Sequence, residues 1–319
     1  MPGINRRYFF LGSFAAALSC SRVAQSPKPR VSIIRAGSYS VDLAAIVRQI
    51  LVEHQVDVAG KRILLKPNLV EFSSHAPINT HPIFVAAVRE AFLALGARQV
   101  GIAEGPGHRR MTLDMASAAG YFADIPKFEQ IFTDLNLDDV SEIRIAQPFS
   151  TLSKIYLPHT VLGCDLLVSL AKMKTHHWTG ATLSMKNLFG VVPGSVYGWP
   201  KNPLHWAGID ECIADLHFLF PRQFCLVDGI EAMEGNGPVL GTRKMARVIA
   251  AGSHPPSVDA TCCRIMQIDP QKIGYLKLIE GRSGWRSNRI RQVGESISSV
   301  QTRFALIPDL ENLRLRTPG

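Results

Sequence analysis

The chain has 319 residues, of which 46% are hydrophobic, 19% charged and 8% aromatic, and its formal net charge at pH 7 is +9. This composition is typical of a globular protein, and the length allows a buried core in one large domain or two smaller ones. The positive charge alone would suit nucleic acid, but the sequence has no run of five basic residues, no aromatic RNA-binding signature and no zinc-finger spacing. We therefore do not expect nucleic acid as a partner.

Residues 1–25 have the pattern of an export signal. They contain no acidic residue, and Arg6 and Arg7 precede an apolar run over 8–18 that is too short to span a bilayer. The stretch Asn-Arg-Arg-Tyr-Phe-Phe-Leu resembles the twin-arginine export motif, although Phe10 stands where leucine is commoner. We expect a twin-arginine signal peptide, read by the twin-arginine translocase, and a mature protein in the periplasm or on the outer face of the cell membrane.

The end of this signal leaves open whether the mature protein carries a lipid. Residues 17–20 read Ala-Leu-Ser-Cys, which resembles a lipobox whose leucine lies one place late, and Cys20 would then be the lipid anchor. A linker, Ser-Pro-Lys-Pro-Arg, follows over 26–30, and residues 31–319 would form one α/β domain or two lobes with a site between them. Twin-arginine export moves folded proteins, often with a cofactor inserted, so the signal favours a bound cofactor.

The other cysteines do not indicate a metal cluster. They form no C-x-x-C pair, so we expect neither an iron–sulfur cluster nor a cysteine-rich zinc site. Most lie in apolar contexts, which predicts core thiols with at most one or two disulfides. These residues are Cys164, Cys212, Cys225, Cys262 and Cys263.

After the linker, short apolar runs alternate with helical patterns. Strands are expected at 31–35, 62–65, 99–103, 165–170, 223–227 and 248–251. Helices are expected at 41–56, 82–95, 112–119, 208–220 and 257–267. Thr80 and Ser257 are the expected N-caps of two of these helices. The alternation predicts an α/β fold with a largely parallel sheet flanked by helices, whereas residues 121–160 and those after 284 give no clear pattern.

The predicted strands end in polar residues, and this is where ligands gather in parallel sheets. The residues that follow the strand bodies are Lys66 and Asn68; Glu104, His108 and Arg109; Lys172, Lys174 and His176; and Asp228, Glu231 and Glu234. Because the carboxyl ends of parallel strands meet at one edge of the sheet, we expect these side chains to form one site. The glycines of the nearby segment 235–241 lack the strand–helix context of a dinucleotide loop and are expected to make turns.

An acid-free window covers 166–208 and holds the densest group of cations. Its basic residues are Lys172, Lys174, Lys186, Lys201, His176, His177 and His205. Neighbouring cations repel, so this pattern predicts an anion supplied from outside the segment. The alternative, a solvated basic loop, is disfavoured by the apolar residues Trp178, Leu188 and Phe189 in the same window. Crowding would also lower lysine pKa values, which would suit one lysine for a base or a covalent anchor.

Several motifs resemble the family known as domain of unknown function 362. They are LLKPNLV at 64–70 with THP at 80–82, KMKTH at 172–176, MKNLFGVVPG at 185–194, and VDGIEAMEGNGPVLGT at 227–242. Their order and spacing extend the resemblance over nearly the whole mature chain. Many members carry a ferredoxin-like iron–sulfur segment, which this chain lacks. The family has no settled reaction, so the resemblance implies a location for the site but no mechanism.

A shorter segment is similar to the N-terminal domain of nickel-pincer lactate racemases. There too a strand ends in Gly-His-Arg before a helix, as in EGPGHRRMT at 104–112. Those enzymes hold a phosphorylated, carboxylated pyridinium cofactor through a lysine and a metal-binding histidine. This similarity implies that a phosphorylated organometallic cofactor, or a divalent metal, is a candidate ligand here.

Together these patterns predict a cationic pocket for a small molecule that carries phosphate or carboxylate. The residues expected to bind the anion or a cofactor are Lys66, Asn68, Arg109, Lys172, Lys174, Lys186 and Asn187. The residues expected to act in acid–base catalysis are His108, His176 and Asp228. The residues considered as ligands of a divalent metal are His176, Asp228 and Glu234.

The expected function is a cofactor- or metal-dependent enzyme with racemase- or epimerase-like acid–base chemistry. A non-catalytic periplasmic protein that binds an anion or a cofactor would use the same pocket. A third reading is an envelope-surface protein whose basic segment contacts anionic lipid. The substrate and the oligomeric state do not follow from the sequence.

Overall fold

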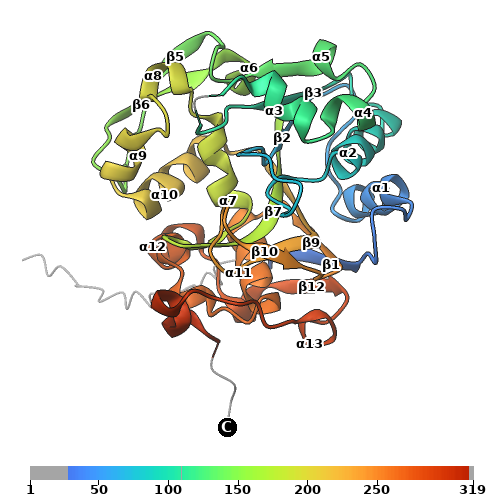
Figure 1. The fold of residues 1–319 in the computed structure, drawn as a ribbon, viewed down its shortest axis with the longest axis vertical. Helices are drawn as coiled ribbons and strands as arrows, with labels where there is room; N and C mark the ends of the chain where they lie inside the picture. Colours follow the sequence, from blue (N-terminus) through green and yellow to red (C-terminus); the bar gives the residue numbers. More distant parts are fainter. Residues whose placement is uncertain (1–27, 109, 316–319) are drawn as a thin grey trace, which may run out of the picture.

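The computed structural model describes residues 28–108 and 110–315 (Figure 1). The export signal, Cys20 and Arg109 lie outside the described residues. The strands are β1 (Arg30–Arg35), β2 (Arg62–Pro67), β3 (Gln99–Glu104), β4 (Phe132–Asp134), β5 (Val140–Arg144), β6 (Lys154–Pro158), β7 (Leu166–His176), β8 (Gly180–Thr182), β9 (Gln223–Glu234), β10 (Thr242–Lys244), β11 (Val248–Gly252) and β12 (Arg291–Gly294). The longer helices are α1 (Leu43–Glu53), α2 (Pro82–Ala94), α3 (Thr112–Ala118), α10 (Ile209–Leu219), α11 (Pro255–Ile265) and α12 (Gly274–Ser283). The shorter helices are α4 (Tyr121–Asp124), α5 (Phe128–Ile131), α6 (His159–Leu162), α7 (Ser184–Asn187), α8 (Gly194–Tyr197), α9 (Asn202–Trp206) and α13 (Ile297–Val300), with 3₁₀ turns η1 (Leu188–Val191), η2 (Pro270–Lys272), η3 (Ser287–Arg289) and η4 (Pro308–Leu313).

The central sheet is largely parallel, as predicted. Its strand order is β12-β1-β11-β9-β7-β2-β3-β4. The run from β9 through β7, β2 and β3 to β4 is parallel, and β12 is parallel to β1. β11 is antiparallel to β9 and β1, and β8 and β10 fold back antiparallel on β7 and β9. The α/β class is therefore confirmed.

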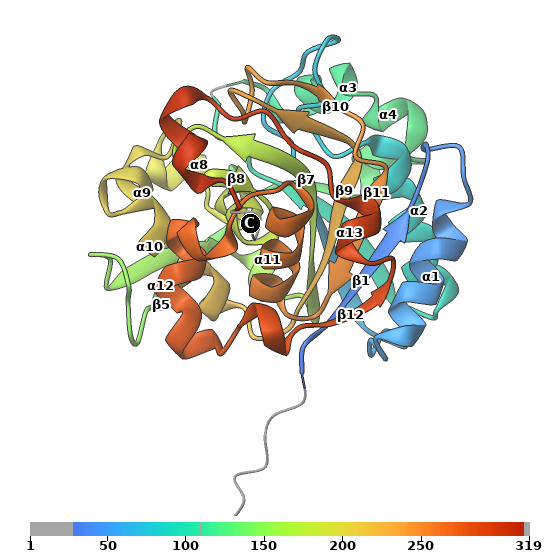
Figure 2. The same ribbon diagram turned by 90° about the horizontal axis from the view of Figure 1, so that it is seen from below.

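Helices cover both faces of this sheet (Figure 2). α1 and α2 lie on one face, and α11 and α12 lie on the other. The apolar run of β7 serves both: Leu167 and Ala171 belong to the core under α11, while Val168 and Leu170 belong to the core under α1 and α2. A strand buried on both faces needs apolar residues at successive positions, which explains why this segment shows no polar alternation.

The direction of the crossovers reverses between β2 and β7. From β2 the chain crosses to β3 through α2, on the face of the α1–α2 core. From β7 it crosses to β9 through α10, whose Cys212 and Ile213 pack into the opposite core. In open α/β sheets the carboxyl ends of two such strands border a crevice where ligands bind.

β7 and β9 extend well beyond their predicted ends. Segment 172–176, expected as a loop, is the second half of β7, and the predicted strand at 223–227 is the first half of β9. The extension is supported because β8 pairs with Lys174–His176 while β9 pairs with β7 on the other side. Hydrogen bonds from both neighbours hold these polar residues in extended conformation, which local hydrophobicity does not reveal.

Two predicted helix caps are wrong. The N-cap of α2 is His81, whose ring nitrogen accepts from Ile83 N at 3.2 Å. Thr80 instead accepts from Asn68 N at 2.9 Å and donates to the carbonyl of Leu170 at 2.6 Å, so it ties the loop after β2 to β7. At α11 the N-cap is His254 rather than Ser257, whose hydroxyl contacts the His254 ring. In both helices the proline at the first position fixes where the helix begins.

The segments without a clear pattern contain very short elements. Residues 121–160 hold α4 to α6 and β4 to β6, each of three to five residues, which is too short for a hydrophobic period to be visible. Strand β12, after residue 284, pairs with β1 at the edge of the sheet.

The five described cysteines are free, and four of them are buried, as expected of core thiols. None of the helices in 28–108 and 110–315 has the length and apolarity needed to cross a bilayer.

A buried aspartate on α11 fixes the start of α7, the short helix that carries Lys186 and Asn187. Asp259 accepts from Ser184 N at 2.9 Å, from Met185 N at 3.1 Å and from the Ser184 hydroxyl. Burial raises the pKa of Asp259 to about 6, and these hydrogen bonds oppose that rise. The start of α7 is thus held by a side chain that lies 75 positions later in the chain, on α11. The sequence around α7 gives no sign of this contact.

Candidate functional site

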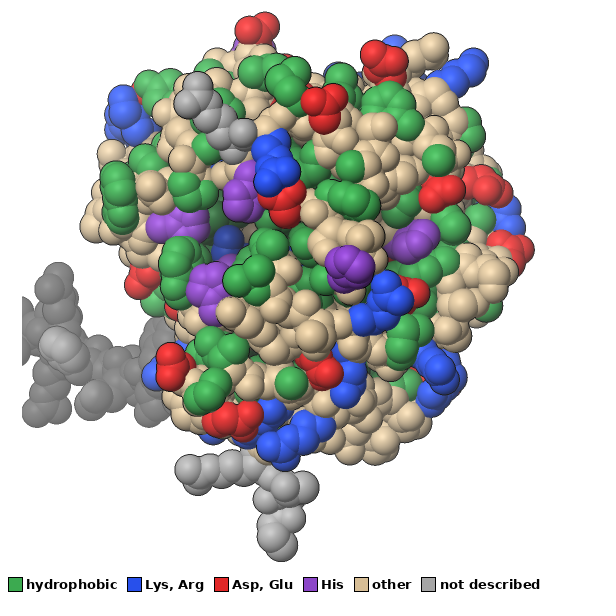
Figure 3. Space-filling model, viewed as in Figure 1, with side chains coloured by type: hydrophobic (Ala, Val, Ile, Leu, Met, Phe, Trp, Pro, Cys, Tyr) green, Lys and Arg blue, Asp and Glu red, His purple; other side chains and the backbone are tan. Residues whose placement is uncertain are grey.

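A cavity of about 710 Å³ opens where β2, β3 and β7 end. In the space-filling view, histidine side chains gather around a hollow on this face (Figure 3). The ionisable and amide side chains that line it are Lys66, Asn68, Glu104, His108, Lys174, His176, His177, Lys186, Asn187, Lys201, Asn202, His205, Asn236 and Asp309. Its larger apolar side chains are Leu69, Val70, Trp178, Phe189, Val239, Leu240 and Ile307. Residues from distant parts of the chain thus meet beside the β2–β7 switch.

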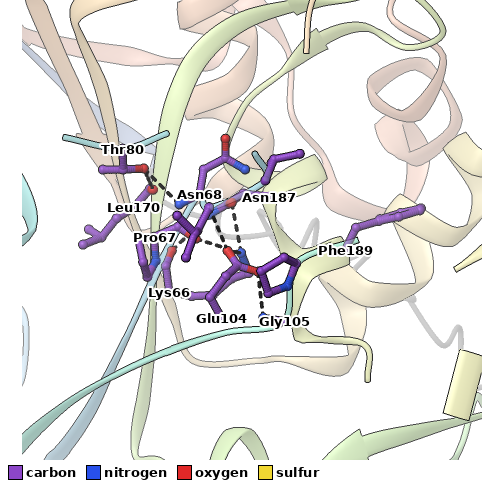
Figure 4. Close-up of polar contacts among 12 residues, drawn as sticks. Lys66, Pro67, Asn68, Thr80, Glu104, Gly105, Leu170, Asn187 and Phe189 are labelled. Carbon is purple, nitrogen blue, oxygen red and sulfur yellow. Dashed lines mark hydrogen bonds and ion pairs between the residues drawn. The ribbon is translucent and has the colours of Figure 1, made fainter. Parts of the chain in front are cut away.

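Lys66, at the end of β2, is held at the base of the cavity (Figure 4). Its ammonium forms an ion pair with Glu104 and donates to Asn187 Oδ1 at 3.1 Å and to the carbonyl of Pro67 at 2.8 Å. All three of its N–H donors are therefore used. Burial lowers the pKa of Lys66, and the charge and hydrogen bond of Glu104 oppose that change.

The Glu104 carboxylate also has several hydrogen-bond partners, and backbone atoms pack closely against it. Besides Lys66 it accepts from Leu69 N at 3.2 Å and from Gly105 N at 2.9 Å. The backbone of Gly190 lies directly against the pair, because a Cβ at this position would overlap Glu104 Oε1 and Lys66 Nζ. Only glycine allows the backbone to approach this closely, so the segment 189–192 packs directly against the ion pair.

Lys174 is fully buried and has no carboxylate partner among the described residues. Its ammonium donates to Asn68 Oδ1 at 2.7 Å, to the carbonyl of Ile78 at 2.9 Å and to that of Pro238 at 3.3 Å. Three oxygen acceptors call for three N–H donors and hence for the charged form. Burial, with the charge of Lys172, nevertheless holds the pKa of Lys174 well below its ordinary value. A bound anion would remove this conflict.

Lys186 and Lys201 complete the group of cations. Lys201 donates to the backbone carbonyls of Gly105 and Phe189, while the ammonium of Lys186 lies 3.6 Å from the centroid of the Phe189 ring. Burial lowers the pKa of both lysines to about 7; the charge of Lys66 adds to this, and nearby acids act against it. Both amines therefore change charge near neutral pH.

The charges of the lining do not balance. Lys66, Lys174, Lys186 and Lys201 face the cavity together with the buried carboxylate of Glu104 and the exposed one of Asp309. Within the described lining, Glu104 is committed to Lys66, and no salt bridge reaches the other three lysines. A cation in a partly desolvated site without a counter-charge is unfavourable, so the cavity is electrostatically suited to an anion.

His176 presents a hydrogen-bond donor to this cavity. Its Nδ1 accepts from the backbone N–H groups of Trp178 at 3.1 Å and Thr179 at 3.3 Å. Burial, followed by the charge of Lys186, holds the pKa of His176 well below its ordinary value, so the ring is neutral. With Nδ1 occupied as an acceptor, the proton of the neutral ring is on Nε2.

His177 and His205 contact backbone carbonyls through Nδ1 instead. Nδ1 of His177 lies 2.8 Å from the carbonyl of Gly237, and Nδ1 of His205 lies 3.2 Å from that of Lys201. A carbonyl oxygen only accepts, so each Nδ1 carries a proton. Burial and the charge of Lys186 lower the pKa of His205, so this ring is neutral and its Nε2 has a lone pair. The cavity thus contains one neutral imidazole that donates from Nε2, His176, and one that accepts at Nε2, His205.

Lys172 and Asp228 form a separate cluster instead of joining the cavity. Asp228 accepts from Lys172 Nζ at 2.7 Å, from the Tyr39 hydroxyl at 2.9 Å and from His81 N at 3.1 Å. Lys172, Tyr39 and His81 line a second, smaller cavity of about 280 Å³, and the rings of Tyr39 and His81 stack with centroids 3.8 Å apart. Burial and the Asp228 charge raise the pKa of Tyr39 far above its ordinary value. With its oxygens so fully engaged, Asp228 is poorly placed to act as a general base.

The predicted metal ligands do not come together. Glu234 is bound to Lys244 at 3.3 Å and to Ala305 N at 2.8 Å, and Asp228 is bound to Lys172. His176 offers Nε2–H rather than a lone pair, whereas a metal-bound histidine donates its other N–H to a partner. Within 28–108 and 110–315, no three His, Cys, Asp or Glu side chains have an arrangement that could hold a metal ion. His176, Asp228 and Glu234 therefore do not form such a group in the part of the chain that the structure describes.

The remaining expected residues lie at the main cavity, and a few important ones were not assigned. Asn68, His108, Lys174, Lys186 and Asn187 line it as expected, and Arg109 lies outside the described residues. Lys201 and His205 were not among the residues expected to bind or react, although both lie in the acid-free window. For Tyr39 the sequence offers no signal, because its partner Asp228 is 189 positions away.

Gly190→Ala should disrupt the base of the site. The added methyl group would overlap Glu104 and Lys66, so the free energy of unfolding should fall by about 1–3 kcal/mol, as for other overpacked cores. Gly281→Ala is the matched control, because a Cβ there meets no atom within 4 Å and the residue lies inside α12. Chemical denaturation measures both. Equal stability of the two variants would contradict the close packing described for Gly190.

Comparison with known proteins identifies the family. Residues 63–264 match the family described as "Domain of unknown function (DUF362)". The thylakoid-associated protein sll1697 of Synechocystis sp. is 28% identical over 260 residues, which is 76% of each chain. The lactate racemase apoprotein of Thermoanaerobacterium thermosaccharolyticum is similar at 17% identity and a TM-score of 0.41; the match covers 75% of this chain and 57% of that one. Since the family match spans more than half of the sequence, the chain belongs to the domain of unknown function 362 family.

Proposed function

We propose that this protein binds a small organic anion, carrying phosphate or carboxylate, and transfers protons on it. The observation that carries the proposal is the excess of positive charge in the main cavity. Lys174, Lys186 and Lys201 line it without a carboxylate partner among the described residues. The lysine ammonium groups would donate charge-assisted hydrogen bonds to the anion, and the N–H of His176 would donate a further hydrogen bond from a neutral ring.

The histidines supply groups for acid–base chemistry on the bound molecule. His176 has an Nε2–H to donate, and His205 has an Nε2 lone pair to accept a proton. The ring of His177 stacks on that of His176 at the same cavity. A donor and an acceptor on one cavity are what proton removal and return require, as in racemisation or epimerisation. We therefore assign the base to His205 or His177 rather than to Asp228.

Binding without turnover is the second candidate function. It is favoured by the state of the buried carboxylates: Glu104 and Asp228 are each paired with a lysine and saturated by hydrogen bonds. A protein of this kind would use the same lysines and would leave the histidines as neutral contacts. Proton transfer on a bound molecule separates the two candidates.

Replacing a cavity lysine should weaken anion binding. For Lys186→Met and Lys201→Met, the affinity for sulfate or phosphate should fall by about tenfold or more each, the loss of one charge-assisted hydrogen bond. Isothermal titration calorimetry measures the affinity, and thermal unfolding checks that the variants fold. Lys277→Met, on the exposed side of α12, is the matched control.

Equal weakening by Lys277→Met, or no binding of either anion to the wild type, would contradict the binding proposal.

Proton transfer is measured on the same protein as exchange of deuterium from D₂O into chiral 2-hydroxy and 2-amino acids. The wild type should exchange at least one of them, and the double variant His177→Gln/His205→Gln should not. Exchange that survives in this variant would remove both histidines as the base.

Anion binding should take up protons at pH 8. Free Lys186 and Lys201 have pKa values of about 7 and are mostly neutral at that pH, and sulfate favours their charged forms. Their pKa values thus rise on binding, and the affinity for sulfate falls as pH increases above about 7. Calorimetry in two buffers with different ionisation enthalpies measures the uptake. Lys186→Arg, which stays charged, should reduce it. An uptake of zero in the wild type would contradict the assigned pKa values.

We also propose that the protein is exported by the twin-arginine pathway. The support is the pair Arg6-Arg7 before a short apolar run and the thylakoid association of the relative sll1697. The periplasm or the outer face of the cell membrane remains the proposed location, with Cys20 as the candidate lipid anchor.

The double substitution Arg6→Lys/Arg7→Lys should stop export, because the translocase recognises the arginine pair. Cell fractionation followed by detection of the protein measures this, and Arg48→Lys in α1 is the control. The wild type and the control should appear outside the cytoplasm in a processed form, and the double variant inside it as precursor. The same distribution for all of them would contradict export by this route.

A further inference from the structure

Lys186 differs from the other lysines of the main cavity in how its amine is bound. Lys66 and Lys174 each use their three N–H donors, and Lys201 donates to two carbonyls. Lys186 Nζ makes no hydrogen bond or ion pair to any residue that the structure describes; it lies over the face of Phe189, 3.6 Å from the ring centroid, and the charges of Lys66 and Asp210 act on it without an ion pair. Its amine is thus the one in this described lining that is free to react.

The position of Lys186 is nevertheless fixed. It lies in α7, whose start is held by Asp259, and the next residue, Asn187, is hydrogen-bonded to Lys66 and to Ser169. The amine therefore projects from a rigid support into the cavity that we propose for the anion. A rigid backbone with an unbound, desolvated amine is the usual setting of a nucleophilic lysine.

Groups for proton transfer adjoin this amine. The ring of His205 lies edge-on to Phe189, with centroids 5.7 Å apart, so it shares the Phe189 ring with the Lys186 ammonium. The charge of Lys186 also acts on both His205 and His176, lowering their pKa values after the effect of burial. His205 has a free Nε2 lone pair and His176 has an Nε2–H, so an acceptor and a donor lie in the surroundings of the amine.

We propose that Lys186 forms an imine with a carbonyl compound that carries a phosphate or carboxylate group. This inference rests on the proposed function, since the anion site is what would bring the carbonyl group to the amine. Lys174 and Lys201 would bind the anionic end, and Lys186 would attack the carbonyl carbon. The ligand class is therefore an aldehyde or ketone with an anionic group, such as a 2-oxo acid or a phosphorylated aldehyde.

The reaction is a condensation and needs no oxidant or reductant. The nitrogen lone pair of the neutral amine forms a bond to the carbonyl carbon, and the π electrons move to the oxygen, which accepts a hydrogen bond from His176 Nε2–H. His205 Nε2 takes a proton from the attacking nitrogen and delivers it to this oxygen, which gives the neutral carbinolamine. A second proton passes in the same way from the nitrogen to the hydroxyl, which leaves as water while the nitrogen lone pair forms the C=N bond. One water molecule is released for each imine formed.

Trapping with borohydride tests this proposal on the full-length protein. Pyridoxal 5′-phosphate is the probe, because it combines an aldehyde with a phosphate, and reduction turns its imine into a stable amine that peptide mass spectrometry locates. We expect the adduct at Lys186, in about tenfold or greater excess over exposed Lys277 near neutral pH, where an ordinary lysine is almost entirely protonated. Excess sulfate should suppress labelling at Lys186, and pyridoxal without the phosphate should label it far less.

Two variants keep the test decisive. Lys186→Arg retains the charge but cannot form an imine, so it should lose the site-specific adduct. Lys277→Arg should bind sulfate and keep that adduct. Thermal unfolding confirms that both are folded. Labelling that persists in Lys186→Arg with the same sulfate sensitivity would place the imine on another residue and overturn the inference.

The outcomes also separate this inference from the proposed function. If the wild type binds sulfate but Lys186 stays unlabelled while surface lysines react, the imine is ruled out and the anion site stands. If sulfate does not bind and Lys186 reacts no faster than Lys277, both fail. Labelling of Lys186 that is specific, competed by sulfate and dependent on the probe's phosphate supports the two together.

Discussion

Lysine ammonium groups and too few carboxylates share one desolvated cavity, and the remaining features of the site depend on this imbalance. The ion pair of Lys66 and Glu104 is closed, since every donor of the lysine is used and the carboxylate also binds two backbone amides. The Glu104 carboxylate therefore does not balance the positive charges of Lys174, Lys186 and Lys201. Each of these must be neutral or must find an anion, because the cost of a lone buried charge exceeds what neutral carbonyls return. The low pKa values of these lysines and the affinity for anions that we propose therefore have one electrostatic cause.

The geometry of the parallel sheet places these lysines together in one cavity. The crossovers reverse between β2 and β7, so the two strands deliver Lys66 and Lys174 to the edge of one crevice. Asp259 on α11 then sets α7 and with it Lys186, while Gly190 allows the backbone to close over the ion pair. The site therefore depends on contacts between the strand ends, α11, α7 and the segment that contains Gly190, and no single motif contains it.

The sequence predicts the sheet well and the site only in part. Apolar strand bodies and polar strand ends identified β2, β3, β7 and β9, and the acid-free window contained three of the four lysines that line the cavity, Lys174, Lys186 and Lys201. It did not show that Lys172 and Lys174 go to different cavities. Residues two apart on a strand normally share a face, but the β7–β9 register shifts between these two, and Lys172 turns to Asp228. Tautomers of His176 and His205 likewise depend on backbone groups that only the folded chain supplies.

The most direct measurement is a crystal structure of the protein grown with selenate, an anion whose selenium is located by anomalous scattering. The account predicts a selenium peak inside the main cavity, with selenate oxygens within hydrogen-bond distance of Lys186 Nζ and of at least one of Lys174 and Lys201. A structure in which the cavity holds no selenium, and in which these amines are paired with carboxylates or turned to bulk water, would contradict it.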